Sequence, residues 1–210
     1  TVGDSLTEAQ DYDIALQREI LATDDTLDVA AVAAHRVSTD VAYPWDQGSK
    51  ALSADELKRR EAWQSRFMPS GAMVAGRVDR LHWMTFGTPE TLPLLYSEQP
   101  PLMTKGRQQA VVRVGALQSD SEATEAQTLN WSTAPRGTAV SVRMSGLLWP
   151  EAAARIANSA YVTRERVGKG QVILFSGQPN FRGSTRGVGR VWLNALVYGP
   201  GLGTSARVEL

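Results

Sequence analysis

The chain contains no cysteine. Disulfide bonds, thiolate nucleophiles and cysteine-based zinc sites are therefore excluded. Histidine is nearly as scarce, since only His35 and His82 occur. Neither histidine lies in a His-x-x-Glu or His-Glu-x-x-His arrangement, and isolated histidines are usually structural or solvent-facing. We therefore expect no metal and no other cofactor in this chain.

Other nucleophile motifs are also missing. No Gly-x-Ser-x-Gly elbow occurs, and Ser176, which follows a predicted strand, has no histidine nearby in the sequence. Thr1 could act through its own amine, as in threonine-type hydrolases. The simpler interpretation is a processing boundary, because the chain begins without Met and is expected to be a piece of a larger protein. The sequence thus predicts no catalytic residue.

Neither sign of charge is in excess, because 22 Lys and Arg balance 22 Asp and Glu. This balance argues against general nucleic-acid binding, although it leaves room for a local basic patch. No apolar run is long enough to span a bilayer, and no signal peptide is visible. With 210 residues, of which 42% are hydrophobic, the chain can form one large domain or two small ones with an ordinary core.

The beginning of the chain differs in pattern from the rest. Thr7 and Gln10 fit a capping box at the start of a helix over residues 7–21. Strand signals are sparse before residue 67 and frequent after it. We interpret 1–66 as an N-terminal helical or irregular part and 67–210 as an α/β core, within one domain overall.

From residue 53 onward, helix and strand signals alternate. Ser53 and Glu56 form a capping box that predicts a surface helix over 54–66. Pro150 is placed at the first position of a short helix over 150–158. The predicted strands fall at 71–78, 92–96, 110–115, 138–144, 161–167 and 171–176. This alternation predicts a layered α/β domain.

The last strand and helix carry the strongest pattern. The segment 172–175 is apolar throughout, as is typical of a central strand covered on both faces. A helix over 184–198 follows, and the sequence Gly199-Pro200-Gly201 is expected to stop it. Its predicted buried face, at helical spacing, consists of Val188, Val191, Trp192, Ala195 and Leu196. We expect Trp192 to pack against the sheet.

The connection between this strand and helix is the best candidate for a binding site. Ligands of open α/β sheets usually bind at such connections, and a helix N-terminus offers free N–H groups and the positive end of its dipole. The functional interpretation is a pocket for an anion or a peptide carboxylate, formed by Gln178, Asn180, Arg182, Ser184 and Arg186. The competing interpretation is structural, with these side chains holding the loop or lying in solvent.

A series of short motifs occurs in order over about 67–198. These are Phe67-x-Pro69-x-Gly71-Ala72, His82-Trp83-x-x-Phe86-Gly87, Leu92-Pro93-Leu94-Leu95-Tyr96, Ser145-Gly146, Gly168-Lys169-Gly170-Gln171-Val172-Ile173-Leu174-Phe175, Pro179-x-Phe181-Arg182-Gly183 and Leu193-Asn194-Ala195-Leu196. The series resembles the C-terminal end of large exported bacterial zinc-carboxypeptidase-like proteins. In those proteins a carboxypeptidase A type domain precedes a domain similar to class I glutamine amidotransferases.

This resemblance implies a flavodoxin-like layered sheet with helices on both faces, and a periplasmic or secreted parent protein. It implies that an upstream peptidase domain of the same polypeptide is the partner and holds the zinc, with peptide as a second candidate partner. It transfers no activity, because a class I amidotransferase needs a cysteine nucleophile and this chain has none. We therefore expect a non-catalytic accessory domain, with a ligand-binding module using 178–186 as the alternative. An independent hydrolase is the least favoured reading.

Overall fold

The computed structural model describes residues 53–130 and 132–202. The chain divides into two compact units, Thr1–His35 and Arg36–Leu210, and all the described residues belong to the second unit. The helix predicted over 7–21 lies outside the described residues. The division at residue 66 remains a prediction for the same reason.

The first described helix, α3, spans Ala54–Arg66, as the capping box predicts. The hydroxyl oxygen of Ser53 accepts a hydrogen bond from the Glu56 N–H at 3.2 Å. Asp55 and Glu56 place negative charge in the first turn, where the helix dipole favours it. The side chains of α3 that the structure describes are exposed, which confirms a surface helix.

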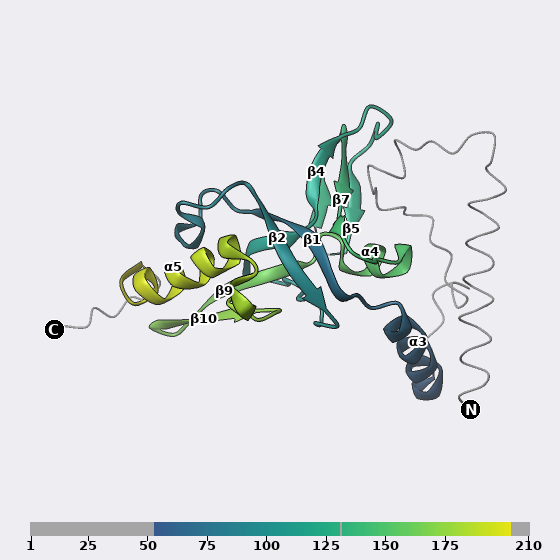
Figure 1. Ribbon diagram of the computed structural model, residues 1–210, viewed down its shortest axis with the longest axis horizontal. Helices are drawn as coiled ribbons and strands as arrows, with labels where there is room; N and C mark the ends of the chain where they lie inside the picture. Colours follow the sequence, from purple (N-terminus) through teal and green to yellow (C-terminus); the bar gives the residue numbers. More distant parts are fainter. Residues whose placement is uncertain (1–52, 131, 203–210) are drawn as a thin grey trace. The chain divides into compact units, whose positions relative to one another are not determined.

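A six-stranded antiparallel sheet forms the centre of the second unit (Figure 1). The strands run in the order β10-β9-β3-β1-β2, and β8 also pairs with β1. Their bounds are Ser70–Val78 for β1, Thr91–Ser97 for β2, Gln109–Val114 for β3, Arg143–Ser145 for β8, Ala160–Val167 for β9 and Gly170–Phe175 for β10. Beyond β2, the carbonyl of Leu102 accepts a hydrogen bond from Ala160 at 2.8 Å. This bridge brings the segment after β2 to the start of β9, so the sheet curls.

Helices and strands mix as the sequence predicts, so the α/β class holds in its coarse form. The pairing differs from that of a flavodoxin-like layered sheet, whose parallel strands need long crossover connections. Here β9 and β10 form a hairpin through Gly168 and Lys169, and β1 pairs antiparallel with β2, β3 and β8. The described strands therefore do not confirm a flavodoxin-like arrangement and are typical of another fold.

Two small ladders and a short helix complete this part. The strands β4 (Ala116–Ser119) and β7 (Thr138–Ser141) form one ladder, and β5 (Gln127–Leu129) and β6 (Ser132–Ala134) form the other. The strand predicted over 138–144 is split into β7 and β8 at Val142, whose carbonyl accepts a hydrogen bond from Ala75. The helix α4 spans Pro150–Ile156 and has its proline at the predicted position.

The last helix, α5 (Arg186–Leu202), lies over one face of the sheet (Figure 1). Near its start, Gly187 contacts the Leu92 side chain of β2. Near its end, the Gly199 carbonyl accepts a hydrogen bond at 2.9 Å from the side chain of Gln171 in β10. The side chains that α5 buries are Val188, Val191 and Asn194. The amide of Asn194 donates to the carbonyls of Met84 and Phe86, both at 2.8 Å, and so fixes the 3-10 turn η1 (Trp83–Thr85) beneath the helix.

One expectation about this region is wrong, and a second holds only in part. Residues 172–175 lie in an edge strand of the described sheet, not a central one. Side chains alternate along a strand, so Gln171 points toward α5 while Val172 and Leu174 point away and are 45% and 51% exposed. The predicted helix face is confirmed for Val188 and Val191, which are buried. Leu196 is 55% exposed and Trp192 is only half-buried, so the rest of the face is shifted.

The end of the helix differs as well. The helix α5 continues through Pro200 to Leu202 instead of stopping at Gly199. Proline removes one backbone donor and crowds the preceding turn, which costs most in a helix interior. Here the proline falls in the last turn, so the helix continues for only two residues beyond it.

Candidate binding groove

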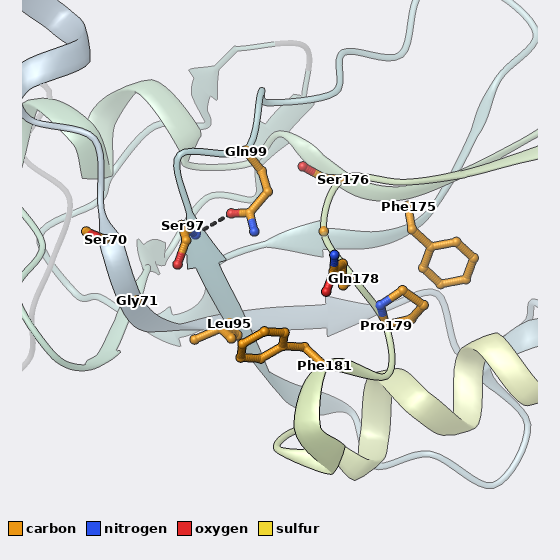
Figure 2. A pocket seen from close by; sticks show the side chains of 11 residues that line it. Ser70, Gly71, Leu95, Ser97, Gln99, Phe175, Ser176, Gln178, Pro179 and Phe181 are labelled. Atoms are coloured by element: carbon orange, nitrogen blue, oxygen red, sulfur yellow. Dashed lines mark hydrogen bonds between the residues drawn. The ribbon is translucent and has the colours of Figure 1, made fainter.

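An open groove of about 880 Å³ lies between the end of β2 and the loop that follows β10 (Figure 2). The residues that line it from the β1–β2 side are Ser70, Gly71, Leu95, Ser97 and Gln99. Those that line it from the loop side are Phe175, Ser176, Gly177, Gln178, Pro179 and Phe181. None of these residues is charged. The groove therefore suits a neutral ligand that combines apolar and hydrogen-bonding groups.

The free edge of β2 borders this groove. The Val78 N–H donates to the Glu90 carbonyl at 3.1 Å, and the Glu98 N–H donates to the Pro69 carbonyl at 2.9 Å. These bonds show that the even-numbered residues of β2 direct their backbone groups toward β1. Because backbone direction alternates along a strand, the outward-directed residues are Thr91, Pro93, Leu95 and Ser97.

The outward backbone groups of β2 differ in their hydrogen bonding along the strand. Pro93 has no N–H, which is typical of an edge strand at a position that faces away from its neighbour. The Ser97 N–H donates to the side-chain oxygen of Gln99, two residues further on. Between them, the outward N–H and C=O of Leu95 have no hydrogen-bond partner among the described residues. The groove therefore contains an open backbone donor and acceptor.

A glycine shapes the β1 side of the groove. The pairing of β1 with β2 shifts register between Ser70 and Ala72, which leaves Gly71 as the extra residue of a bulge. Gly71 has φ +85°, a left-handed conformation that glycine adopts without strain. The bulge bends the end of β1 beside the groove.

Two buried tyrosines lie behind Ser176. The rings of Tyr96 and Tyr161 are 6.4 Å apart, and burial is the main cause that raises the pKa of each hydroxyl to about 12. The nearby Ser176 hydroxyl partly offsets the rise in the pKa of Tyr96. This hydroxyl donates its own hydrogen bond to the Pro100 carbonyl at 2.8 Å. The Tyr96 hydroxyl itself has no hydrogen-bond partner among the described residues.

Gly177 lets the loop pass over this pair. A Cβ atom at Gly177 would lie 2.5 Å from the hydroxyl oxygen of Tyr161 and 3.2 Å from the side-chain nitrogen of Gln99. The Ser176 N–H also donates to the Tyr161 carbonyl at 2.8 Å. The loop wall of the groove is thus held close to β9 by backbone as well as side-chain contacts.

Of the five predicted site residues, Gln178 alone lines the groove. Asn180 and Ser184 lie on either side of the 3-10 turn η2 (Phe181–Gly183). The Asn180 carbonyl accepts a hydrogen bond from the Gly183 N–H at 3.3 Å, and the Ser184 hydroxyl donates to the Phe181 carbonyl at 3.0 Å. The first contact uses the backbone of Asn180, and only Ser184 holds the turn with its side chain.

The two predicted arginines lie at the turn and at the helix start. Arg182 has φ +47°, and its guanidinium carbon lies 5.2 Å from the centre of the Phe181 ring. Arg186 is the first residue of α5, and both side chains are exposed. The structure thus places Asn180, Arg182 and Ser184 around one turn, with Arg186 next to it. A role of this set in anion binding remains a prediction.

Sequence reasoning missed Leu95, Ser97 and Gln99, which line the groove. Their position depends on strand pairing and on a loop about 80 residues away, neither of which has a local signature. One usable signal was Pro93, since a proline inside an apolar strand indicates an edge.

A second exposed feature is the outer side of α5. Leu193, Leu196 and Val197 are 46%, 55% and 62% exposed and share one side of the helix at i, i+3 and i+4. We call these three residues the outer stripe. No charged residue occurs in α5 after Arg190. A helix that is apolar on all sides is usually buried on all sides. Because the outer stripe is exposed, the described residues do not supply all of the cover that such a helix needs.

An apolar cavity lies at the end of the same helix. It has a volume of about 270 Å³ and is lined by Trp83, Phe86, Tyr198 and Leu202. Phe86 is 72% exposed and Leu202 is 57% exposed. Such a cavity could accept an apolar side chain of a partner.

Residues 53–130 and 132–202 contain no group of three or more metal-ligating side chains, and none of their helices has the length and apolar character that crossing a membrane requires. The imidazole Nδ1 of His82 accepts a hydrogen bond from the Met84 N–H at 3.2 Å. Burial is the main cause that lowers the pKa of His82. A neutral imidazole that caps η1 fits a structural role.

Comparison with known proteins assigns no family. No family model, no curated protein and no solved structure matches this chain. The resemblance to zinc-carboxypeptidase-like proteins therefore remains an expectation.

Proposed function

We propose that this chain is a non-catalytic accessory domain that packs against another protein domain through the outer stripe of α5. The exposure of Leu193, Leu196 and Val197 carries this proposal. Full burial of one such side chain is worth about 1.5–3 kcal/mol, so a partner that covers the stripe gains several kcal/mol.

The motif resemblance supplies the expected partner. It is an upstream peptidase domain of the same polypeptide, in an exported, periplasmic or secreted bacterial protein, and any zinc would belong to that domain. The same resemblance also implies a flavodoxin-like arrangement, which the antiparallel pairing of the described strands does not support.

Site-specific photo-crosslinking in the source organism tests the proposal. A photoreactive residue replaces Leu196 in one variant and Leu174 in the control. Leu174 is the same residue type, is 51% exposed, and points away from α5. We expect position 196 to crosslink to a peptidase domain identified by mass spectrometry and position 174 to crosslink far less. Equal crosslinking at both positions, or none at 196, would contradict the proposal.

A charge on the stripe gives an independent readout. Leu196→Glu should leave the domain folded, because the side chain is already half exposed, yet it should block packing against an apolar partner surface. Loss of the crosslinked or co-purified partner, with an unchanged circular dichroism spectrum, is the expected result. Leu174→Glu should retain the partner.

A ligand-binding module that uses residues 178–186 is the second candidate function. The presence of Gln178 in the groove wall favours it. The exposed guanidinium of Arg182 beside the groove residue Phe181 is consistent with an anion nearby. Sulfate titration of the parent chain and of Arg182→Ala tests this candidate separately.

A further inference from the structure

We infer that the groove binds an extended, uncharged peptide segment, which joins the sheet as an additional strand along the edge of β2 at Leu95–Ser97. This site is separate from the outer stripe of α5. The N–H and C=O of Leu95 point away from β1, in the plane of the sheet, and have no hydrogen-bond partner among the described residues. A backbone donor and acceptor on one residue are what an added strand requires.

The groove places room for a strand beside this edge. Leu95 and Ser97 line one wall, and the loop from Phe175 to Phe181 forms the other (Figure 2). A β-strand neighbour lies about 4.8 Å away and bonds at alternate residues, so it would engage Leu95 and Ser97 in succession. Pro93 has no N–H to offer, so the full donor and acceptor pattern stops short of it.

The Gln99 side chain supplies the hydrogen-bond acceptor that a neighbouring strand would offer to Ser97. Its side-chain oxygen accepts the outward N–H of Ser97, which a carbonyl of a paired strand would otherwise accept. Exchange of this local hydrogen bond for one to a peptide carbonyl changes the number of bonds little. The Gln99 side chain would then be released into solvent.

The chemistry of the lining defines the occupant. None of the residues that line the groove is charged, so a charged side chain buried there would lose water without gaining a partner. Leu95 and Phe181 lie at the same end of the groove in Figure 2 and provide apolar contact. Ser176 provides a polar group toward the other end. The occupant is thus a neutral peptide with an apolar side chain toward Leu95 and Phe181.

Titration with a defined peptide tests this inference. The probe is the blocked peptide acetyl-Thr-Val-Ser-Leu-Thr-Val-amide, followed by amide NMR of the full chain and by calorimetry. We expect saturable binding with shifts centred on Leu95 and Ser97, and slower hydrogen exchange of the Leu95 amide. A peptide with N-methyl groups on alternate residues keeps the side chains and removes backbone donors, and it should bind at least tenfold more weakly.

Two protein variants sharpen the test. Gln99→Ala frees the Ser97 N–H and should raise peptide affinity roughly two- to tenfold, the effect of one hydrogen bond. Leu95→Pro removes the outward donor and should abolish binding. If Leu95→Pro does not fold, the N-methylated peptide still decides the question, because it leaves the protein unchanged.

Several results would overturn the inference. These are equal binding of the N-methylated peptide, no binding of the blocked peptide at millimolar concentration, or weaker binding by Gln99→Ala. Shifts confined to 182–190 that require a free peptide carboxylate would instead support the arginine site. Shifts at Leu95 that grow with protein concentration in the absence of peptide would identify a second copy of the chain as the occupant and would also overturn it.

Discussion

The guanidinium of Arg77 donates a hydrogen bond to the side-chain oxygen of Asn158, 81 residues further along the chain. Arg77 also donates to the Gly115 carbonyl at 3.2 Å. The amide nitrogen of the Asn158 side chain donates to the carbonyls of Leu129 and Ser132, at 3.3 Å and 2.7 Å. One fully buried side chain thus connects β1, the β5–β6 ladder and the segment after α4.

Asn158→Ala should lower the free energy of unfolding by about 2–4 kcal/mol. The substitution removes several buried hydrogen bonds, deprives the Arg77 guanidinium of an acceptor, and places alanine at φ +61°. Urea denaturation measures the change, and the exposed Asn180→Ala is the control. A loss below about 0.5 kcal/mol for Asn158→Ala would show that this network contributes little to stability.

Tyr96→Phe should leave the free energy of unfolding unchanged or raise it by about 1–2 kcal/mol. The hydroxyl of Tyr96 is buried without a partner among the described residues, and such a group costs desolvation energy that phenylalanine avoids. Tyr198→Phe, at a side chain that is 40% exposed, should change stability little. A loss of stability in Tyr96→Phe would show that this hydroxyl makes a favourable hydrogen bond, and the nearby Ser176 hydroxyl is the first candidate for its partner.

The same tyrosine predicts a dependence on alkaline pH. Burial raises the pKa of Tyr96 from 10.0 to about 12, so the native state holds this proton more tightly than the unfolded state does. Ionisation of this group does not affect stability below pH 10, and stability falls as the pH rises from 10 to 12, where the unfolded state loses the proton first. Stability should therefore fall less steeply over this range in Tyr96→Phe than in the parent. Parallel slopes in urea melts at pH 9, 10 and 11 would contradict the raised pKa.

Elements with local signals were predictable from the sequence. The capping boxes and Pro150 fixed the starts of α3 and α4, and the glycine turn fixed the β9–β10 hairpin. The apolar segment 172–175 misled, because its composition suits a buried strand while its partners leave it at an edge. The face of α5 was also misplaced in part, since a helix that is apolar on all sides has no distinct periodic stripe.

The groove could not be predicted in the same way. Gln178 was found because loops between a strand and a helix often carry ligands. Leu95 and Gln99 belong to the groove because β2 is an edge strand and because the loop after β10 packs beside it. Both facts depend on long-range pairing, which alternation along a single segment does not encode.

Arg182→Ala separates the two readings of the loop 178–186. The side chain is exposed, and its contact with the Phe181 ring is worth about 0.5–1 kcal/mol, so stability should change by no more than about 1 kcal/mol. Sulfate titration of the parent and the variant then tests the anion pocket, with Arg190→Ala as control. Binding that is lost in Arg182→Ala alone would support the pocket, whereas unfolding of the variant would identify Arg182 as part of the loop scaffold.

Two glycines of α5 should respond to alanine in opposite ways. Alanine is favoured over glycine in a helix by up to about 1 kcal/mol. At Gly189, a new Cβ would meet only the Pro179 carbonyl oxygen at 3.8 Å, an ordinary contact, so Gly189→Ala should raise the free energy of unfolding by about 0.5–1 kcal/mol.

At Gly187, the new Cβ would lie 2.5 Å from the Leu92 side chain, which is completely buried and cannot move without disturbing the core. Overpacking of this kind costs about 1–3 kcal/mol, which exceeds the gain in helix propensity, so Gly187→Ala should lower stability. Parallel urea melts compare the two variants. If Gly187→Ala proves as stabilising as Gly189→Ala, the start of α5 is not held against Leu92, and the helix that carries the outer stripe is less firmly seated on the sheet than these contacts require.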